Sequence, residues 1–72
     1  MREWLRSIRS EKQLTQLEMG QKMGISESYY NLIENGARQT NMDISTISKL
    51  ANALEISVAD IIKYEINYKK GA

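Results

Sequence analysis

Apolar residues recur at helical spacing along almost the whole of the 72-residue chain, with no internal repeat and no low-complexity linker. Such spacing is typical of helices that bury one face. In the first segment, which runs to about Lys12, Met1, Leu5 and Ile8 share a face. The pattern predicts an all-α protein folded as a compact bundle of about five helices.

Capping signals mark where the second and third helices begin and end. Thr15 followed by Glu18 is a capping box, so the second helix is expected to start after Thr15. Gly24 is its natural stop, because glycine adopts a left-handed backbone at a helix end at little cost. Ser26 is the next N-cap candidate, and the third helix is expected to end at Asn35-Gly36.

The C-terminal half predicts two further helices. Asp43 is the N-cap candidate of the fourth helix, and Ser57 with Asp60 marks the start of the fifth. The domain formed by the five helices is expected to span residues 1–63. The inward positions of the fourth helix are expected to be Ile44, Ile47, Leu50, Ala51 and Leu54.

The C-terminal tail, residues 64–72, fits two structures. Tyr64, Ile66 and Tyr68 alternate with polar residues, which is the periodicity of a strand. Ile62 and Ile66 fit a continuing helix equally well. Both alternatives stay open at this point.

The composition removes the commonest catalytic and metal-binding chemistry. The chain has no histidine and no cysteine. It therefore lacks the most frequent metal ligand, the most frequent general base at neutral pH and any thiolate, and we expect neither a metal nor a cofactor. An enzyme would need paired carboxylates in a cleft, and a bundle of this size leaves little room for a pocket of ~300 Å³. We therefore expect no enzymatic activity.

Charge and hydropathy say less about the binding partner. The net charge is +1 at pH 7 and the pI is about 8.0, a balance that neither supports nor excludes a nucleic acid. No apolar run approaches the ~20 residues that span a membrane. The start of the chain, Met1-Arg2-Glu3-Trp4, is unlike a signal peptide. We expect a cytoplasmic protein that does not contact membranes.

The third helix is expected to carry an unusual outer face. On a helical wheel of ~100° per residue, Tyr30 and Ile33 turn toward the core. The opposite face combines hydrogen-bonding side chains, mostly short, with a leucine: Glu27, Ser28, Asn31, Leu32 and Asn35. A solvated face would more often carry long, charged side chains, whereas short ones lose little entropy when pressed against base edges. The face therefore predicts a contact with base pairs.

A family resemblance lies first in residues 15–36, T-Q-L-E-M-G-Q-K-M-G-I-S-E-S-Y-Y-N-L-I-E-N-G. They resemble the helix-turn-helix of the phage lambda repressor and Cro class, also called the xenobiotic-response-element (XRE) class. A second block, S-K-L-A-N-A-L-E-I-S-V-A-D-I-I, resembles that family's fourth and fifth helices. The resemblance covers residues 1–62 and implies a lambda-repressor-like bundle in which helices two and three form the motif. It also implies a sequence-specific regulator of transcription that binds double-stranded DNA, most simply a small repressor.

The resemblance assigns base contacts to the third helix. Glu27 and Ser28 match positions that read bases in the family, where a carboxylate accepts from cytosine and a hydroxyl donates or accepts. Leu32 suits the methyl group of thymine. Asn31 would reach either a base or a phosphate, and the sequence leaves this alternative open.

Contacts with phosphates are expected around the ends of the two helices. By resemblance, Gln16 contacts a phosphate beside the free amides of a helix N-terminus. The other phosphate candidates are Ser26, Tyr29, Asn35 and Arg38.

Three further expectations concern packing. Arg9 and Glu34 match an ion pair that, in relatives, ties the first helix to the end of the third. Gly20 matches a position of alanine or glycine at which the second and third helices pack closely. Trp4 and Leu17 are expected to be exposed.

The resemblance also implies a homodimer that binds a palindromic operator with half-sites ~34 Å apart. The expected dimer interface is formed by the fifth helix and the tail, through Ile62, Tyr64, Ile66 and Tyr68. Proteins of the same fold also act as antitoxins that bind a partner enzyme, or as controller proteins of restriction–modification systems. A protein partner, such as a toxin or an inducer, therefore stays an open alternative.

Overall fold

Five helices make up most of the computed structural model, which describes residues 1–36 and 42–70. They are α1 (Glu3–Glu11), α2 (Gln16–Met23), α3 (Glu27–Asn35), α4 (Ile44–Leu54) and α5 (Val58–Lys70). The described residues include no strand, and none of these helices is long and apolar enough to cross a membrane. The predicted all-α bundle is confirmed. Of the two alternatives for the tail, the structure has the helix, since α5 continues to Lys70.

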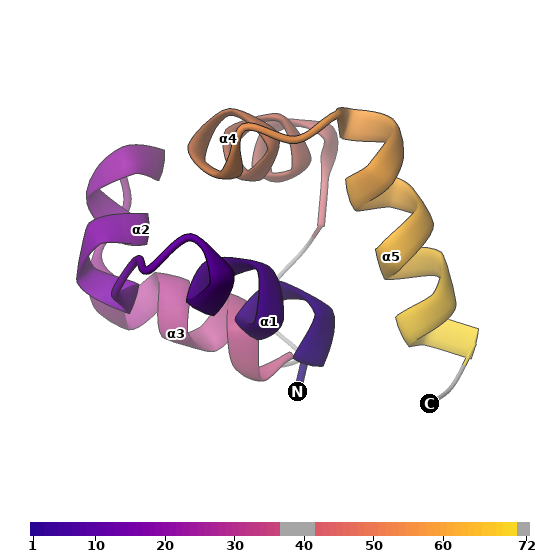
Figure 1. Ribbon diagram of the computed structural model, residues 1–72, viewed down its shortest axis with the longest axis horizontal. Helices are drawn as coiled ribbons and strands as arrows, with labels where there is room; N and C mark the ends of the chain where they lie inside the picture. The colour runs from indigo at the N-terminus through magenta and orange to yellow at the C-terminus, as the bar shows by residue number, and fades with distance from the viewer. Residues whose placement is uncertain (37–41, 71–72) are drawn as a thin grey trace.

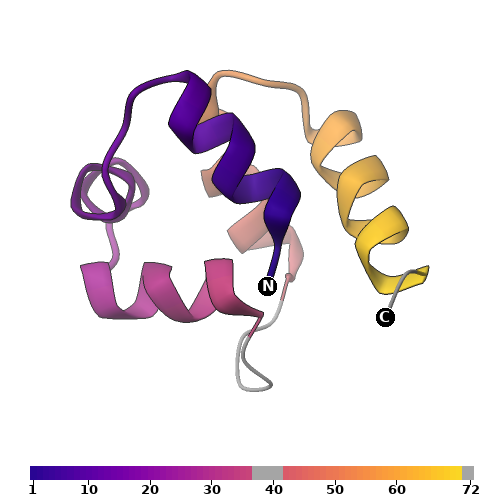
Figure 2. The same ribbon diagram turned by 60° about the horizontal axis from the view of Figure 1, so that its bottom comes forward.

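α2 packs against α3 and α4, and α4 also packs against α5. Figures 1 and 2 show α2 and α3 on one side of α1 and α5 on the other, and α4 lies at the top of Figure 1. The N-terminus and the C-terminal end of α5 lie on the same side of the molecule (Figure 1). The radius of gyration is 11.0 Å, which matches the value of about 11 Å expected for a compact chain of this length.

The core takes at least one fully buried side chain from every helix. The largest apolar residues that are 0% exposed are Leu5, Met19, Tyr30, Ile33, Leu50, Leu54 and Ile61. Burying a side chain of this size contributes roughly 1.5–3 kcal/mol. Tyr30 and Ile33 thus fix the inner face of α3, as the helical wheel predicts, and the outer face must point away from the core.

The predicted caps are present, because each depends only on residues close in the sequence. Thr15 and Glu18 form the capping box at the start of α2. The side chains of Ser26 and Asp43 accept hydrogen bonds from Tyr29 N and Thr46 N at the starts of α3 and α4. Gly24 ends α2 with a φ of 72°, a value that glycine adopts without steric cost.

Two residues predicted to face inward do not. Ile44 is 86% exposed, because it is the first residue of α4 and the fully buried side chains of that helix begin only at Leu50. Met1 is 47% exposed, because α1 begins at Glu3 and the helical spacing does not extend back to Met1.

The prediction that Trp4 is exposed is also wrong, whereas Leu17 is 49% exposed as expected. Trp4 packs against the core and stacks on Tyr64 of α5, with ring centroids 5.5 Å apart. The reason is the helical form of the tail, since only a continued α5 brings Tyr64 over α1.

The C-terminal cap of α4 allows a test of backbone strain. Glu55 ends this helix with φ 58° and ψ 42°, a left-handed conformation that costs a residue with a Cβ ~1–2 kcal/mol. Glu55→Gly is therefore expected to raise the free energy of unfolding by about 0.5–1 kcal/mol, after allowing for the greater freedom of glycine in the unfolded chain. Urea unfolding measures the change. Glu55→Ala keeps the Cβ and serves as the matched control, and an equal gain in both variants would contradict the explanation.

Candidate functional site

The turn that joins α2 to α3 packs closely on α2 because a glycine lies at the contact. Gly20 is buried on α2. A Cβ at this position would lie 2.9 Å from the carbonyl oxygen of Ile25 and 3.2 Å from that of Ser26. The left-handed Gly24 then turns the chain at the end of α2. The two glycines thereby fix the path of the chain from α2 into α3.

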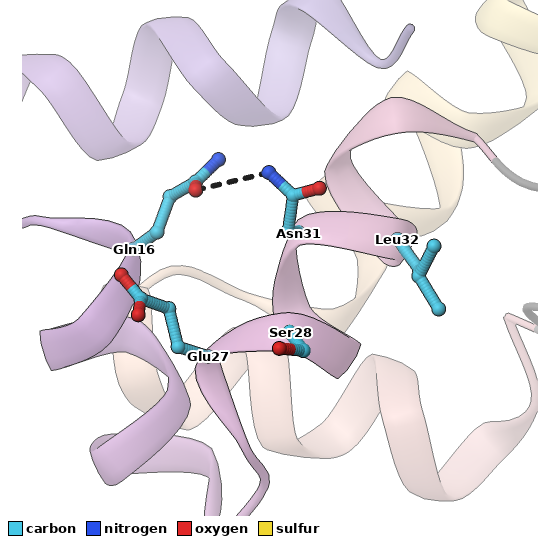
Figure 3. A pocket seen from close by; sticks show the side chains of 5 residues that line it. All are labelled: Gln16, Glu27, Ser28, Asn31 and Leu32. Atoms are coloured by element: carbon cyan, nitrogen blue, oxygen red, sulfur yellow. Dashed lines mark hydrogen bonds between the residues drawn. The ribbon is translucent and has the colours of Figure 1, made fainter.

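An open hollow of about 400 Å³ lies between these two helices and is lined by Gln16, Glu27, Ser28, Asn31 and Leu32 (Figure 3). Gln16 is the first residue of α2, and the other four come from α3. Glu27, Ser28 and Leu32 are exposed, while Gln16 and Asn31 are half-buried. The structure therefore brings the four residues predicted to read bases together with one predicted to contact a phosphate.

The hollow is larger than expected, because the sequence led us to predict little room for a pocket of even ~300 Å³. It is formed between helices at the surface rather than inside the bundle. Its lining includes one carboxylate, that of Glu27, whereas hydrolysis by carboxylates typically uses a pair. Within residues 1–36 and 42–70, no group of acidic side chains is arranged to hold a metal ion.

Side-chain amides form a hydrogen-bonded chain along this site. Asn31 Nδ2 donates to Gln16 Oε1 over 3.0 Å (Figure 3), and Asn35 Nδ2 donates to Asn31 Oδ1 over 2.9 Å. Each bond uses one amide hydrogen of its donor, and an amide nitrogen carries a second one. The three side chains therefore hold one another in place while each keeps hydrogen-bonding capacity for a ligand.

Glu34 anchors this chain from the buried side. Its carboxylate accepts hydrogen bonds from Arg9 Nε at 2.8 Å, Arg9 Nη2 at 3.0 Å, Tyr30 Oη at 2.7 Å and Gln16 Nε2 at 3.4 Å. The Glu34 side chain is 1% exposed. The ion pair between Arg9 and Glu34 thus joins α1 to α3, and Gln16 extends the link to α2.

The same contacts perturb the ionisation of this cluster. Burial opposes the charged form of Glu34, but the hydrogen bonds from Arg9 and Tyr30 outweigh it and hold the pKa of Glu34 below its ordinary value of 4.5. Burial and the bond to Glu34 raise the pKa of Tyr30. Glu34 is therefore ionised and Tyr30 neutral at pH 7, which keeps the carboxylate as the acceptor for the three side chains that donate to it, those of Arg9, Tyr30 and Gln16.

The remaining phosphate candidates lie at both ends of α3. Tyr29 is 37% exposed and Asn35 is exposed. Ser26 Oγ accepts from the Tyr29 N–H, so its own hydroxyl hydrogen stays available for an acceptor. Arg38 lies outside the described residues.

The predicted dimer residues differ in their surroundings on α5. Ile62 and Ile66 are 42% and 50% exposed. Tyr64 stacks on the indole of Trp4 in α1. Tyr68 is half-buried, and the guanidinium of Arg2 lies over its ring. Two of the four residues are therefore engaged within the chain.

Sequence reasoning missed the residues that fasten α5 to the rest of the bundle. Arg2 and Glu65 are 4% and 7% exposed and form an ion pair in which both nitrogen–oxygen distances are 2.9 Å. One signal pointed to such a partner. Helix C-termini favour a nearby cation, and the last turn of α3 has no basic residue of its own.

The sequence matches the family model described as Helix-turn-helix over residues 5–61. This span contains every residue that lines the hollow and ends within α5. The match agrees with the all-α architecture.

Similar proteins include two from Bacillus subtilis (strain 168). The uncharacterized HTH-type transcriptional regulator YqaE is 36% identical over 65 residues, which cover 90% of this chain and 54% of that protein. For the uncharacterized HTH-type transcriptional regulator YqaF, the identity is 42% over 45 residues, covering 62% of this chain and 59% of that protein.

A third similar protein is the immunity repressor protein of Bacillus phage phi105. It is 35% identical over 66 residues, which cover 92% of this chain and 44% of that protein. The chain thus spans about half the length of the curated relatives it matches. No solved structure gives a significant match.

Proposed function

Because this chain belongs to the helix-turn-helix family of transcriptional regulators, we propose that it recognises a specific sequence of double-stranded DNA with the outer face of α3. The observation that carries the proposal is the outer face of α3, with Glu27, Ser28, Asn31 and Leu32, set beside the capped N-terminus of α2 in one hollow. A repressor role is supported by the similarity to the immunity repressor protein of the phage. We propose that this chain acts in the cytoplasm, where a bacterium such as that of the Bacillus relatives keeps its DNA.

Each lining residue has a chemistry suited to a different part of the duplex. Ser28, at the exposed start of α3, suits a base edge in the major groove, and Leu32, 41% exposed, suits a thymine methyl group. Gln16 lies beside the free amides of the α2 N-terminus, where a phosphate binds favourably. The proposal assigns Asn31 to holding Gln16 in this position, with its second amide hydrogen directed to the DNA.

In this proposal, Glu27 contributes more to the discrimination between bases than to the affinity for DNA. A carboxylate close to DNA is repelled by the phosphates, but it accepts well from the amino group of cytosine. Bases without a donor at that place would leave the charge unpaired, which costs free energy. The low net charge of +1 fits a protein that depends on base contacts as much as on phosphate attraction.

The proposal includes a homodimer on a palindromic operator. Val58, Ile62 and Ile66 are 44%, 42% and 50% exposed and lie four residues apart in α5, so they form one apolar stripe on the outside of that helix. A second copy bound there would present two α3 helices to half-sites ~34 Å apart.

The same apolar stripe suits another protein, which keeps an antitoxin role as the second candidate. A controller-protein role would be distinguished mainly by the neighbouring genes. The two roles differ in what the purified chain does alone. A dimer in solution and a palindromic site support the homodimer. A monomer that selects a site without symmetry supports a separate protein partner.

Selection from a random duplex library tests the proposed function directly. The purified chain is incubated with the library, and bound duplexes are amplified and sequenced. An enriched palindrome would supply the operator, the spacing of its half-sites and the symmetry of the complex. Failure to enrich any sequence over several rounds would overturn sequence-specific binding.

Ser28→Ala separates reading of a base from attraction to the backbone. We expect the variant to lose discrimination at one base-pair position by ~1–3 kcal/mol, because one hydrogen bond to a base edge is removed. Binding to unrelated duplexes should stay unchanged. Competition binding with single-position variants of the selected site measures both quantities. Ser45→Ala, at an exposed position of α4, is the matched control, and an equal loss on all duplexes would contradict the assignment.

A further inference from the structure

Arg2 lies between the end of α3 and the last turns of α5 and binds both. Its backbone N–H donates to the carbonyl oxygen of Glu34 over 2.7 Å, and its Nη1 donates to that of Ile33. Its Nε and Nη2 donate to the two carboxylate oxygens of Glu65, each over 2.9 Å. One buried side chain therefore connects the two helices.

The contacts with α3 complete the C-terminal end of that helix. The last carbonyls of an α-helix have no partner within the helix and carry partial negative charge. In α3, the Gly36 N–H donates to the carbonyl oxygen of Ile33 over 3.2 Å. Arg2 supplies the additional donors and the positive charge that α3 lacks in its own last turn.

Tyr68 of α5 contacts both Arg2 and the end of α3. Its ring centroid lies 5.2 Å from Arg2 Cζ, a geometry that favours a cation over an aromatic face. Its hydroxyl occupies the space that a Cβ of Gly36 would need, and Gly36 is the left-handed residue that ends α3. The C-terminal part of α5 therefore touches the cap of the helix that carries the candidate base contacts.

We propose that Arg2 is a positioning residue for DNA recognition, an inference that rests on the proposed function. It holds the C-terminal half of α3, and with it Leu32 and Asn35, at a fixed place relative to the bundle. Glu65 and Tyr68 hold Arg2 in turn. α5 thereby acts on the recognition surface without touching DNA.

This arrangement gives α5 two separate faces. The inner face carries Ile61 and Glu65, both buried, and the half-buried Tyr68. The exposed apolar stripe on the outer face is the proposed contact with a second copy. Binding on that stripe would stabilise the docked α5, and through Arg2 it would stabilise the end of α3. Association and DNA recognition are therefore expected to favour each other.

The fluorescence of Trp4 can report whether α5 is packed against α1. Trp4 is the single tryptophan and stacks on Tyr64 of α5, and its Nε1 is buried without an acceptor among the described residues. Its fluorescence should therefore change when α5 separates from α1. Amide hydrogen exchange in the last turn of α3 reports the other end of the contact independently.

Three variants separate positioning from general stability. Arg2→Met removes the cation, and Arg6→Met is the matched control because Arg6 is an exposed arginine of α1. The double change Arg2→Glu with Glu65→Arg restores an ion pair between the same two positions but places a carboxylate against the carbonyls of α3. Each variant is studied under conditions in which circular dichroism shows that it is folded. Its Kd is measured for the duplex that the wild-type chain selects from the library.

We expect Arg2→Met to raise the Kd for that duplex ~10-fold or more, because DNA binding would then have to order the end of α3, which the charge-assisted hydrogen bonds of Arg2 hold in place in the free protein. We also expect faster exchange at the end of α3. Arg6→Met should leave that exchange unchanged. The double change should restore the Trp4 fluorescence but neither the slow exchange nor the affinity. If it restores wild-type affinity, or if Arg2→Met binds as tightly as Arg6→Met, the positioning role is overturned.

Should Arg2→Met not fold, Arg2→Lys takes its place. Lysine keeps the charge but cannot donate to Ile33 and to both oxygens of Glu65 at once. We therefore expect a smaller rise in Kd than in Arg2→Met, together with faster exchange in α3. An unchanged Kd would overturn the positioning role. The exchange and fluorescence measurements need no DNA. If the wild-type chain selects no sequence, the proposed function fails, whereas unchanged exchange in the variants refutes the contact through Arg2.

Discussion

Replacing Glu34 with alanine is expected to lower the free energy of unfolding by ~3–5 kcal/mol, the typical loss when one partner of a buried ion pair is removed. The guanidinium of Arg9, 15% exposed, and the fully buried hydroxyl of Tyr30 would both lose their acceptor. A domain of 72 residues is commonly stable by only about 4–11 kcal/mol. The variant is thus expected to be partly unfolded at 37 °C or close to it.

Urea unfolding of Glu34→Ala beside Glu11→Gln measures this loss. Glu11 is exposed at the end of α1, so its variant should unfold at nearly the wild-type urea concentration. A loss below about 1 kcal/mol in Glu34→Ala, the size typical of exposed ion pairs, would show that the Glu34 cluster contributes little.

Acid should remove the same stabilisation in the wild-type protein. The pKa of Glu34 in the folded protein lies below its ordinary value of 4.5, so the folded state favours the ionised form. Its contribution is complete at pH values above 4.5 and is lost as the pH falls through the folded pKa. In Glu34→Gln, the free energy of unfolding should fall less over this acidic range. Parallel pH curves for the two proteins would contradict the explanation.

Replacing Gly20 with valine is expected to cost ~1–3 kcal/mol or more through overpacking and to abolish binding to the selected duplex. The first atom of any side chain there would lie 2.9 Å from the carbonyl oxygen of Ile25, in the turn that joins α2 to α3, so we expect valine to displace this turn and with it the start of α3. Such a movement would break the 3.0 Å bond between Gln16 and Asn31. The phosphate contact and the base contacts would then no longer match one duplex.

Two comparisons isolate the cause in Gly20→Val. Gln21→Val introduces the same branched side chain at an exposed position of α2, and it should affect neither stability nor DNA binding strongly. The stability and DNA affinity of Gly20→Ala should lie between those of the wild type and of Gly20→Val. Alanine makes a smaller clash than valine, and its higher helix propensity offsets this by ~1 kcal/mol. Urea unfolding and binding to the selected duplex are the measurements. DNA binding retained in folded Gly20→Val would disprove the need for close packing at this position.

The local features of the fold are those that the sequence predicts well. The caps at Thr15, Ser26 and Asp43 form because a side chain meets an amide only a few residues away, whatever the rest of the chain does. The outer face of α3 is equally local, since helical geometry separates Tyr30 and Ile33 from it.

Errors appear where a residue lies at the end of a helix or meets a distant segment. Ile44 fits the helical spacing but lies too close to the start of α4 to reach the core. Trp4 is covered only because Tyr64, far away in the sequence, comes to lie over it. Periodicity contains no information on such contacts, because it records faces of single helices and not their partners.

The sequence by itself determined five helices, most of their ends and which side of α3 stays free of the core, because helical periodicity and capping act within a few residues. Only the tertiary structure decided that the tail continues as a helix and that Arg2 joins Glu65 to the end of α3. These depend on contacts between segments as far apart as 63 residues, where burial and charge pairing select one arrangement among several that local preferences allow.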